Sequence, residues 1–411
     1  MGVTHIDEAE LPFIDIHSNA YATNRQSVVG EALRRSWVAR SATGVHILDY
    51  DVIREMVRDK RLDGAGTGFF ESKGGSPMLV DYSRDGMLPL IQGPRHDRIR
   101  RVLQRGFGSG RINEMRLVMR RVAEDLIGRI PPDGRFDMTA DFSHWYPLRV
   151  LCALIGVPEG DVERFSQWTV TLGLVGRTPL DPHLAKIDDA LTRLYGYYRE
   201  LVAERRDDLG DDFISTLIRT QAESETLTEE EMFGALVNFL FAGHDTTRYQ
   251  LGWAMYLLLA NRDQWDMLVA DPSLAGNAVE EAMRLEPSLD GFVRQVREDV
   301  VYREILFPAG SFIGLCALAA NNDPRIFPDP ERFDITRPNA SKQLTFGLGQ
   351  RLCLGNGLAR AEMEEALILF ATRFPGLETD GPPQVPEGYT SMKGLEHFPL
   401  ILNGVHAERL A

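Results

Sequence analysis

The sequence predicts a mainly α-helical protein with a small β-rich region, and three patterns support this fold class. A segment from a capping signal at Thr228 to about residue 259 is predicted as one unusually long helix, and residues 354–372 carry apolar side chains at helical spacing. The pattern over 112–221 is also helical, with breaks at 131–132, 158 and 173–182. Short alternating stretches such as 45–48 are typical of strands.

No internal repeat, low-complexity tract or shift in composition marks a second domain. We therefore expect residues 1–411 to form a single domain. Its β-rich part is predicted mainly at 1–62, 292–320 and 374–403, with a terminal hairpin in the last of these, and the remainder is predicted as helical.

Composition limits the classes of function. The chain has 60 acidic and 45 basic residues and a net charge of −15, so it lacks the basic surface of a general nucleic-acid binder. Its N-terminus has neither a signal-peptide nor an anchor pattern, and the longest apolar run, 232–243, is shorter than the roughly 20 residues of a membrane span. The three cysteines, an odd number in a long chain, indicate a reducing compartment, so we expect a cytoplasmic protein. We also expect a monomer that binds no membrane.

Residues 63–93 are predicted as a long loop. Seven glycines and two prolines in this stretch disfavour regular structure. Long loops inside compact domains are more often functional than not. Its apolar residues, among them Leu88 and Leu90, are therefore expected to reach a pocket.

The helix that opens at Gly93-Pro94 carries His96 and Arg100 one turn apart on the same face. Two cationic donors at this spacing suit two carboxylates of a ligand. A solvated basic face is the alternative explanation.

The long helix is predicted to begin with a capping box, because Thr228 is followed three residues later by Glu231. In its middle, a pair of small residues is followed by an acid and a hydroxyl, Asp245 and Thr246. A threonine hydroxyl that bonds back to the chain can open a helix and admit water. Taken alone, the stretch is equally well explained as a local kink.

The glycine-rich stretch from Phe346 to Gly355 presents Cys353 just before a helix. The glycines let a flat ligand approach the backbone, and the helix N-terminus favours a thiolate, which is a soft metal ligand. Cys152 and Cys316 lie in apolar runs, so neither a zinc nor an iron–sulfur site is expected. A single protein ligand is sufficient only for a cofactor that brings its other ligands, as haem does.

This stretch resembles the haem-binding signature of the cytochrome P450 family, Phe-x-x-Gly-x-(His/Arg)-x-Cys-x-Gly, with every specified position filled. Glu281-x-x-Arg284 and Pro330-Glu331-Arg332-Phe333 precede it in the order of that family. The resemblance to soluble bacterial members implies the P450 fold. It also implies one haem b between the long helix and the cysteine-loop helix, with Cys353 as the iron ligand.

The resemblance also implies roles for other residues. Asp245 and Thr246 would be the catalytic acid–alcohol pair, and Glu281, Arg284 and Arg332 would form a structural network behind the cysteine loop. Arg351 stands where many relatives have histidine, and we expect it still to donate to a haem propionate. The expected cofactor-binding residues are His96, Arg100, Ala242, Arg294, Phe346, Gly347, Arg351, Cys353 and Gly355. The expected substrate-pocket residues are Leu88, Leu90, Asn238, Phe241, Asp290, Phe292 and Met392.

The predicted function is a haem-thiolate monooxygenase that inserts one oxygen atom from O2 into a small organic substrate, expected to be a natural-product intermediate. Electrons would come from NADH or NADPH through a ferredoxin reductase and a ferredoxin. Asn238 and Asp290 predict a substrate with a hydroxyl, amide or amine group. The alternatives are a peroxygenase that uses H2O2, a haem sensor or ligand-binding protein without turnover, and a helical protein without haem. The Asp245-Thr246 pair speaks against the first two.

Overall fold

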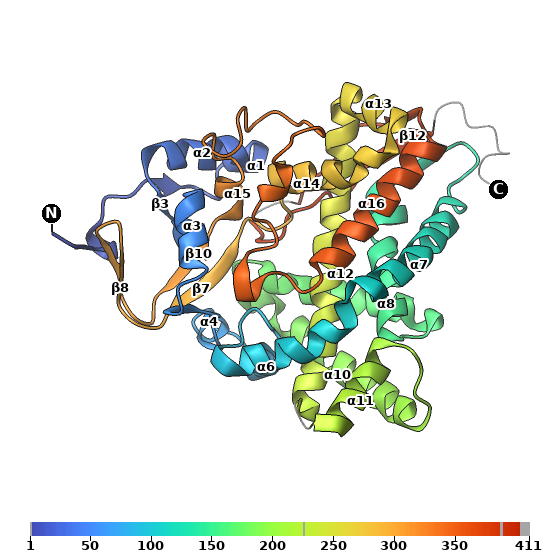
Figure 1. Cartoon of the computed structure of the whole chain (residues 1–411), viewed down its shortest axis with the longest axis horizontal. Helices are drawn as coiled ribbons and strands as arrows, with labels where there is room; N and C mark the ends of the chain where they lie inside the picture. The colour runs from blue at the N-terminus through green and yellow to red at the C-terminus, as the bar shows by residue number, and fades with distance from the viewer. Residues whose placement is uncertain (1, 225–226, 387–388, 403–411) are drawn as a thin grey trace.

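Long helices and short strands gather on different sides of the molecule (Figure 1). The computed structural model describes residues 2–224, 227–386 and 389–402. The helices of the first half are α1 (Asn19–Thr23), α2 (Arg25–Arg35), α3 (Tyr50–Met56), α4 (Gly68–Glu71), α5 (Pro77–Asp85), α6 (Gly93–Leu103), α7 (Ser109–Ile127), α8 (Trp145–Ile155), α9 (Val162–Leu172) and α10 (Leu184–Asp207). They are followed by α11 (Phe213–Ser224), α12 (Glu229–Ala260), α13 (Arg262–Ala270), α14 (Ala275–Leu285), α15 (Ala317–Ala320) and α16 (Asn356–Arg373).

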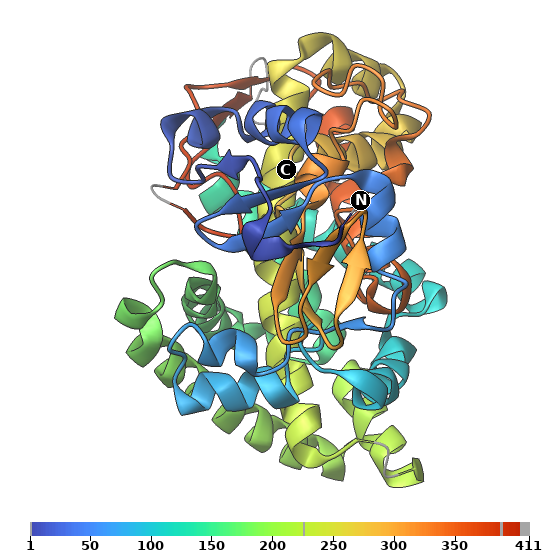
Figure 2. The same ribbon diagram turned by 90° about the vertical axis from the view of Figure 1, so that its left-hand side faces the viewer.

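The strands of the described residues form one six-stranded sheet and two three-stranded sheets. The six-stranded sheet has the order β2-β3-β4-β10-β7-β5, with bounds Phe13–Ile14, Val38–Ser41, Gly44–Ile47, Phe312–Leu315, Phe292–Val296 and Leu62–Asp63. β4 and β10 pair in parallel, with Val45 opposite Ile313. Strands from near the N-terminus therefore lie beside strands from 292–315 (Figure 2).

The smaller sheets combine distant segments in the same way. One has the order β1-β9-β8, with bounds Thr4–His5, Ile305–Phe307 and Val300–Tyr302. The other has the order β11-β12-β6, with bounds Leu377–Thr379, Pro399–Leu402 and Arg135–Asp137. β11 and β12 form the predicted terminal hairpin, but β6 lies in a segment predicted as helical. Its residues follow a proline break and pair with β12, where Phe136 lies opposite Leu400, so tertiary pairing decides their conformation.

The long helix α12 runs through the centre of the helical side and packs against α8, α10, α14 and α16. Its predicted capping box is confirmed: the Glu231 backbone N–H donates to Thr228 Oγ1 (3.2 Å), and the Thr228 N–H donates to Glu231 Oε2 (3.1 Å). Most of its residues are buried, because neighbouring helices surround it. The prediction of a mainly α-helical fold with a small β-rich region is confirmed.

The predicted loop at 63–93 is partly helical, so that prediction is wrong over α4 and α5. Ser76 Oγ accepts the backbone N–H of Leu79 (3.1 Å), and Pro77 occupies the first turn, where its missing N–H costs nothing. Leu79 and Tyr82 are buried, and α5 packs against α10 and α12. The many glycines of the stretch predicted a loop, and α5, with only nine residues, was therefore not predicted.

Across the described ranges 2–224, 227–386 and 389–402, every helix is too short or too polar to span a lipid bilayer.

Candidate active site

The cysteine loop is closed by a backbone hydrogen bond from the Cys353 N–H to the Phe346 carbonyl oxygen (2.8 Å). Gly347 and Gly349 have φ angles of +70° and +66°, which side-chain-bearing residues rarely adopt. Cys353 is exposed, whereas Cys152 and Cys316 are buried. Cys353 Sγ is therefore the thiol that a ligand can reach.

Desolvation opposes the thiolate that the helix N-terminus is expected to favour. The Cys353 side chain is accessible, but desolvation by the neighbouring protein raises the pKa of its thiol above the ordinary value. The Gly355 backbone N–H, Arg100 and Arg360 act in the opposite direction but do not outweigh burial. A metal that binds this sulfur therefore has to displace its proton.

One face of α12 is unusually accessible for a helix that is otherwise buried. Asn238, Ala242 and Thr246 follow one another at four-residue spacing, so they share this face, although Asn238 itself is buried. Ala242 is exposed, Thr246 is partly exposed, and Thr246 Oγ1 donates to the Ala242 carbonyl oxygen (2.7 Å). The hydroxyl bonds back to the chain as expected, but α12 stays one continuous α-helix, so the expected opening is not found.

Asp245 points into a buried polar cluster next to this face. Its Oδ1 lies 2.9 Å from Arg248 Nε and 3.3 Å from His244 Nδ1. Burial alone would raise the pKa of Asp245, but Arg248 and His244 outweigh it and hold that pKa below its ordinary value. Asp245 is therefore ionised at neutral pH.

The cluster continues to His144, which sequence reasoning missed. Arg248 Nη1 donates to His144 Nδ1 (3.2 Å), and His144 Nε2 lies 2.7 Å from Ser166 Oγ. Burial, His244 and Arg248 together lower the pKa of His144 to about 3, so this ring stays neutral. Because His144 and Ser166 lie far from Asp245 in sequence and match no motif, no sequence signal identifies them as members of this cluster.

Two predicted carboxylate-binding residues are cations without a carboxylate partner. Within the described residues Arg100 and Arg294 form no ion pair, and the Arg294 side chain donates only to the neighbouring Val293 carbonyl oxygen (2.8 Å). Arg294 is buried, and burial together with the charge of Arg351 lowers its pKa to about 9. Arg100 lies close enough to Cys353 for each to influence the pKa of the other.

The other two predicted carboxylate-binding residues already have partners. Arg351 forms an ion pair with Asp63, and it donates to the carbonyl oxygens of Ile91 (2.7 Å) and Pro89 (3.1 Å). It thereby ties the 63–93 segment to the cysteine loop. His96 is buried with its Nδ1 2.9 Å from Asp97 Oδ1, and burial and Arg351 lower its pKa.

Comparison with known proteins decides the family. The cytochrome P450 family model matches residues 165–392. The chain is 33% identical to luteothin monooxygenase of Streptomyces thioluteus over 383 residues, which cover 92% of this chain and 91% of that protein.

The chain belongs to the cytochrome P450 family. It is also 36% identical to the vitamin D(3) 25-hydroxylase of Pseudonocardia autotrophica, over 70% of each chain. Among solved structures it resembles CalO2, with a TM-score of 0.89 and 26% identity over 96% of this chain and 99% of that one. It is therefore a P450 monooxygenase, an oxidoreductase whose family implies a haem-thiolate cofactor and the use of O2.

The side chains of this P450 fit a haem. One accessible thiol lies near the N-terminus of α16, and two half-buried or buried guanidinium groups, those of Arg100 and Arg294, lack carboxylate partners in the described residues. A buried cation is costly without an anion, and the two propionates of a haem would supply carboxylates. A carboxylate bound at His96 Nε2 would likewise raise the pKa of that ring.

The structural network behind the cysteine loop differs from the prediction at one residue. Glu281 Oε2 lies 2.7 Å from Arg284 Nε, as expected, but Glu281 Oε1 lies 2.9 Å from Arg337 Nε. Arg332 contributes only its carbonyl oxygen, which accepts from Arg284 (3.2 Å) and Arg337 (2.9 Å), while its side chain is 66% exposed. The prediction for the Arg332 side chain is therefore wrong, and Arg337 takes the expected place.

The network reaches the cysteine loop through the residues that precede Phe346. Thr345 Oγ1 donates to the Met283 carbonyl oxygen of α14 (2.9 Å), and the Leu344 N–H donates to Asn321 Oδ1 (2.7 Å). Arg284 in turn donates to the Asn321 carbonyl oxygen (3.0 Å). The carboxylate and its two arginines thus support the loop from behind.

Replacing Arg337 with alanine should destabilise the protein far more than replacing Arg332. Loss of Arg337 leaves the fully buried Glu281 with one cation fewer, and breaking a buried ion pair typically costs about 3–5 kcal/mol. Loss of the exposed Arg332 side chain should change the free energy of unfolding by less than about 1 kcal/mol. Urea unfolding of both variants measures the difference, and equal effects would restore the original prediction for Arg332.

Asp290 does not point into the substrate pocket, so that prediction is also wrong. Its Oδ2 accepts the hydroxyl of Tyr21 (2.6 Å), and its Oδ1 forms an ion pair with Arg25. The guanidinium of Arg25 is buried and costly without anions, and Asp290 is one of its two carboxylate partners, with Glu286 as the other. Phe292 lies beside the cysteine loop, where a Cβ added to Gly347 would be 3.7 Å from its ring.

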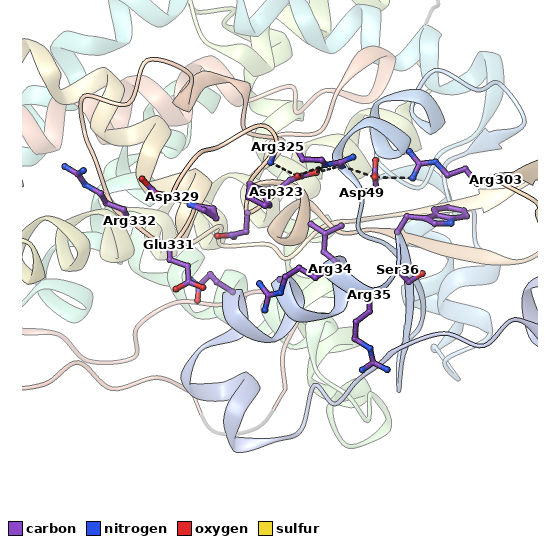
Figure 3. A pocket seen from close by; sticks show the side chains of 17 residues that line it. Arg34, Arg35, Ser36, Asp49, Arg303, Asp323, Arg325, Asp329, Glu331 and Arg332 are labelled. Carbon is purple, nitrogen blue, oxygen red and sulfur yellow. Dashed lines mark hydrogen bonds and ion pairs between the residues drawn. The ribbon is translucent and has the colours of Figure 1, made fainter.

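A cavity of about 900 Å3 on the β-rich side lies outside the site (Figure 3). It is lined by α2 and by residues from 322 to 332. Along one wall the charged side chains pair with each other: Asp49 binds Arg303 (3.2 Å) and Arg325 (2.9 Å), and Arg325 also binds Asp323. The cavity contains none of the predicted cofactor-binding residues.

Proposed function

We propose that this P450 inserts one oxygen atom from O2 into a C–H bond of a small organic substrate, with Cys353 as the iron ligand. Electrons would reach it from NADH or NADPH through a ferredoxin reductase and a ferredoxin. The observation that carries this proposal is one accessible cysteine near Arg100, with a second cation, Arg294, near Arg351 of the same loop; neither Arg100 nor Arg294 forms an ion pair in the described chain. Its relatives are named for luteothin and vitamin D(3), which are organic molecules.

When bound, haem supplies the iron at which O2 is activated. In this proposal Cys353 Sγ anchors the iron, while Phe346, Gly347 and Gly355 shape the loop around the sulfur. Arg100 and Arg294 neutralise the propionates, with His96 and Arg351 as further donors. Ala242 leaves space for the macrocycle on α12, because its methyl group is the smallest side chain that keeps a good helix.

In the proposed reaction Thr246 and Asp245 move protons toward the site of O2 activation. The Thr246 hydroxyl faces the accessible side of α12, and Asp245 lies one residue earlier in its buried ion pair with Arg248. Leu88, Leu90, Phe241 and Met392 provide apolar contacts to the substrate. Asn238 provides a polar group.

Oxygen-18 labelling tests the proposed function. With a surrogate ferredoxin and reductase, NAD(P)H consumption should be coupled to product that carries one atom from labelled O2. Label derived from H2O2, in the absence of NAD(P)H, would favour a peroxygenase. Ligand-induced spectral change without NAD(P)H consumption or product would favour a sensor.

Replacing Arg294 with methionine should speed haem loss without destabilising the polypeptide. Arg294 is a buried cation without a carboxylate partner in the described chain, so its removal relieves a desolvation cost in the protein itself. With haem bound, the same change removes a charge-assisted hydrogen bond worth about 1.5–3 kcal/mol, so the haem affinity should fall roughly 10- to 100-fold. Haem transfer to excess apomyoglobin measures this loss, and an unchanged rate would contradict the assignment.

Replacing Asn238 with leucine should weaken binding of a polar substrate only. Asn238 is buried on the accessible face of α12, and its side chain forms no hydrogen bond within the described chain. A substrate hydroxyl, amide or amine bonded to it contributes about 1 kcal/mol, so the dissociation constant should rise about fivefold. Spectral titration with the substrate and with an analogue lacking the polar group separates this effect from a general change of the pocket.

A further inference from the structure

Arg25 is a buried arginine far from the site in sequence. It is the first residue of α2 and is only 5% exposed. Its Nη2 donates to Glu286 Oε2 (2.8 Å) and to the Pro287 carbonyl oxygen (2.7 Å), and its Nη1 forms an ion pair with Asp290. One guanidinium group therefore holds both ends of the 286–290 segment.

Two neighbours of Arg25 strengthen the same contact. Tyr21, on α1, donates its hydroxyl to Asp290 Oδ2 (2.6 Å), and Gln26 Nε2 donates to the Leu285 carbonyl oxygen (3.1 Å). The Lys393 ammonium group lies 4.3 Å from the centre of the Tyr21 ring, so a second cation approaches the two carboxylates. The N-terminal helices α1 and α2 thus fix the 286–290 segment from outside.

On its other side, the 286–290 segment is attached to α12 at the candidate active site. Gln250, four residues after Thr246, donates from Nε2 to the Glu286 carbonyl oxygen (2.9 Å) and accepts the Ser288 N–H at Oε1 (2.9 Å). The chain then continues to Phe292, beside Gly347 of the cysteine loop. The segment and its continuation therefore connect Gln250 of α12 with Gly347 of the cysteine loop, through Phe292.

The 390–393 segment is attached to the 286–290 segment in turn. The Lys393 N–H donates to the Ser288 carbonyl oxygen (2.8 Å), and Leu289 and Met392 form an antiparallel bridge. The Ser391 N–H donates to the Gly176 carbonyl oxygen (3.2 Å).

Gly173 packs closely between Met392 of the 390–393 segment and Asp245 of α12. A Cβ added to Gly173 would lie 2.5 Å from Asp245 Oδ2 and 3.9 Å from the Met392 methyl group. A chain of contacts therefore runs from Arg25 through the 286–290 and 390–393 segments to Gly173 and Asp245.

We propose that Arg25 is a positioning residue for substrate selection: through Glu286 and Asp290 it holds the 286–290 and 390–393 segments in the places that shape the substrate pocket. This inference rests on the proposed function, because the pocket matters only if substrate binds above a haem. It assigns a role in specificity to α1 and α2, which contribute no residue to the site. It also gives Asp290 a function different from substrate contact.

The experiment compares two azole probes that bind haem iron and differ in size, imidazole and 4-phenylimidazole. Asp290→Asn and Tyr21→Phe weaken the anchor with little change of shape. We expect the dissociation constant of imidazole to stay within twofold, because it needs only the iron. That of 4-phenylimidazole should rise at least fivefold, because its ring needs ordered walls.

Two further variants separate positioning from general stability. Arg25→Lys keeps the charge but loses the planar, bidentate geometry, so it should shift the ratio of the two dissociation constants less than Arg25→Met does. Arg149→Gln is the matched control, since it removes a half-buried arginine that also pairs with two carboxylates, Asp125 and Glu159, away from the pocket. It should lower the thermal stability and leave the ratio unchanged.

The possible failures are distinguishable. A ratio that stays within twofold in Asp290→Asn and Arg25→Met would overturn the role of Arg25 while leaving the proposed function intact. Absence of any azole-induced spectral shift in the unmodified protein would instead overturn the proposed function. If Arg149→Gln shifts the ratio of the two dissociation constants as much as Arg25→Met does, the effect is explained by lost stability alone. That result would also overturn the inference.

Discussion

Replacing Cys353 with alanine should abolish the strongly red-shifted absorption band of the dithionite-reduced, carbon monoxide-bound protein, together with all monooxygenase activity. The wavelength of that band depends on a thiolate bound to iron. The thiolate also donates the electron density that favours O–O cleavage. Cys353 is the exposed cysteine of the three, so no other thiol can replace it without unfolding. The measurement is a single absorption spectrum of the purified protein.

The other two cysteines provide matched controls. Cys152 and Cys316 are buried, and burial raises the pKa of each to about 12, so neither forms a thiolate at neutral pH. Cys152→Ala and Cys316→Ala should keep the red-shifted band. If the band survives in Cys353→Ala, or disappears in Cys152→Ala, the assignment of the iron ligand is wrong.

The fold class was predictable because its strongest signals are local and long. The capping box at Thr228 and the apolar spacing after Cys353 are both read within a few turns of one helix, and the structure confirms both helices. α5 escaped prediction because a helix of nine residues between glycines has too little periodicity to outweigh them. β6 escaped because only its pairing with β12 makes it a strand.

Site residues that depend on partners distant in sequence were harder to predict. Motif order selected Glu281 and Arg284 correctly as an ion pair, but it chose Arg332 over Arg337, five residues later. Which of two arginines turns inward depends on the path of the intervening loop, and the sequence does not encode that path as a pattern. Asp290 was misplaced for the same reason, because its partner Arg25 lies 265 residues away.

Electrostatics shows the same division between local and distant causes. The helix N-terminus near Cys353 is a local feature and was predicted, but the burial that raises the pKa of that thiol is a property of the whole fold. Similarly, Asp245 was recognised beside Thr246, whereas the influence of His144 on the cluster requires α8 to pack against α12. Sequence patterns therefore identify the reactive groups better than they predict the protonation states.

Replacing Asp245 with asparagine should lower the NAD(P)H-supported turnover by roughly 10²- to 10⁴-fold, the usual contribution of a positioned proton donor. Asparagine keeps the size of the side chain but cannot carry a proton from solvent. Thr246→Val, which removes the hydroxyl at constant shape, should lower product formation as well. Product formed from H2O2 should be nearly unaffected by Asp245→Asn, because the peroxide brings its own protons, and this activity checks that haem and pocket are intact.

Arg248 allows a test with a defined direction of pH dependence. Burial acts to raise the pKa of Asp245, whereas Arg248, 2.9 Å away, makes the largest contribution to lowering it. Removing that charge in Arg248→Gln leaves burial dominant, so the pKa of Asp245 should rise and the acidic limb of the turnover profile should move to higher pH. Since Asp245→Asn has no such group, its profile should lack this limb. A limb that stays in place in Arg248→Gln, or persists in Asp245→Asn, would mean that protons reach the site without Asp245.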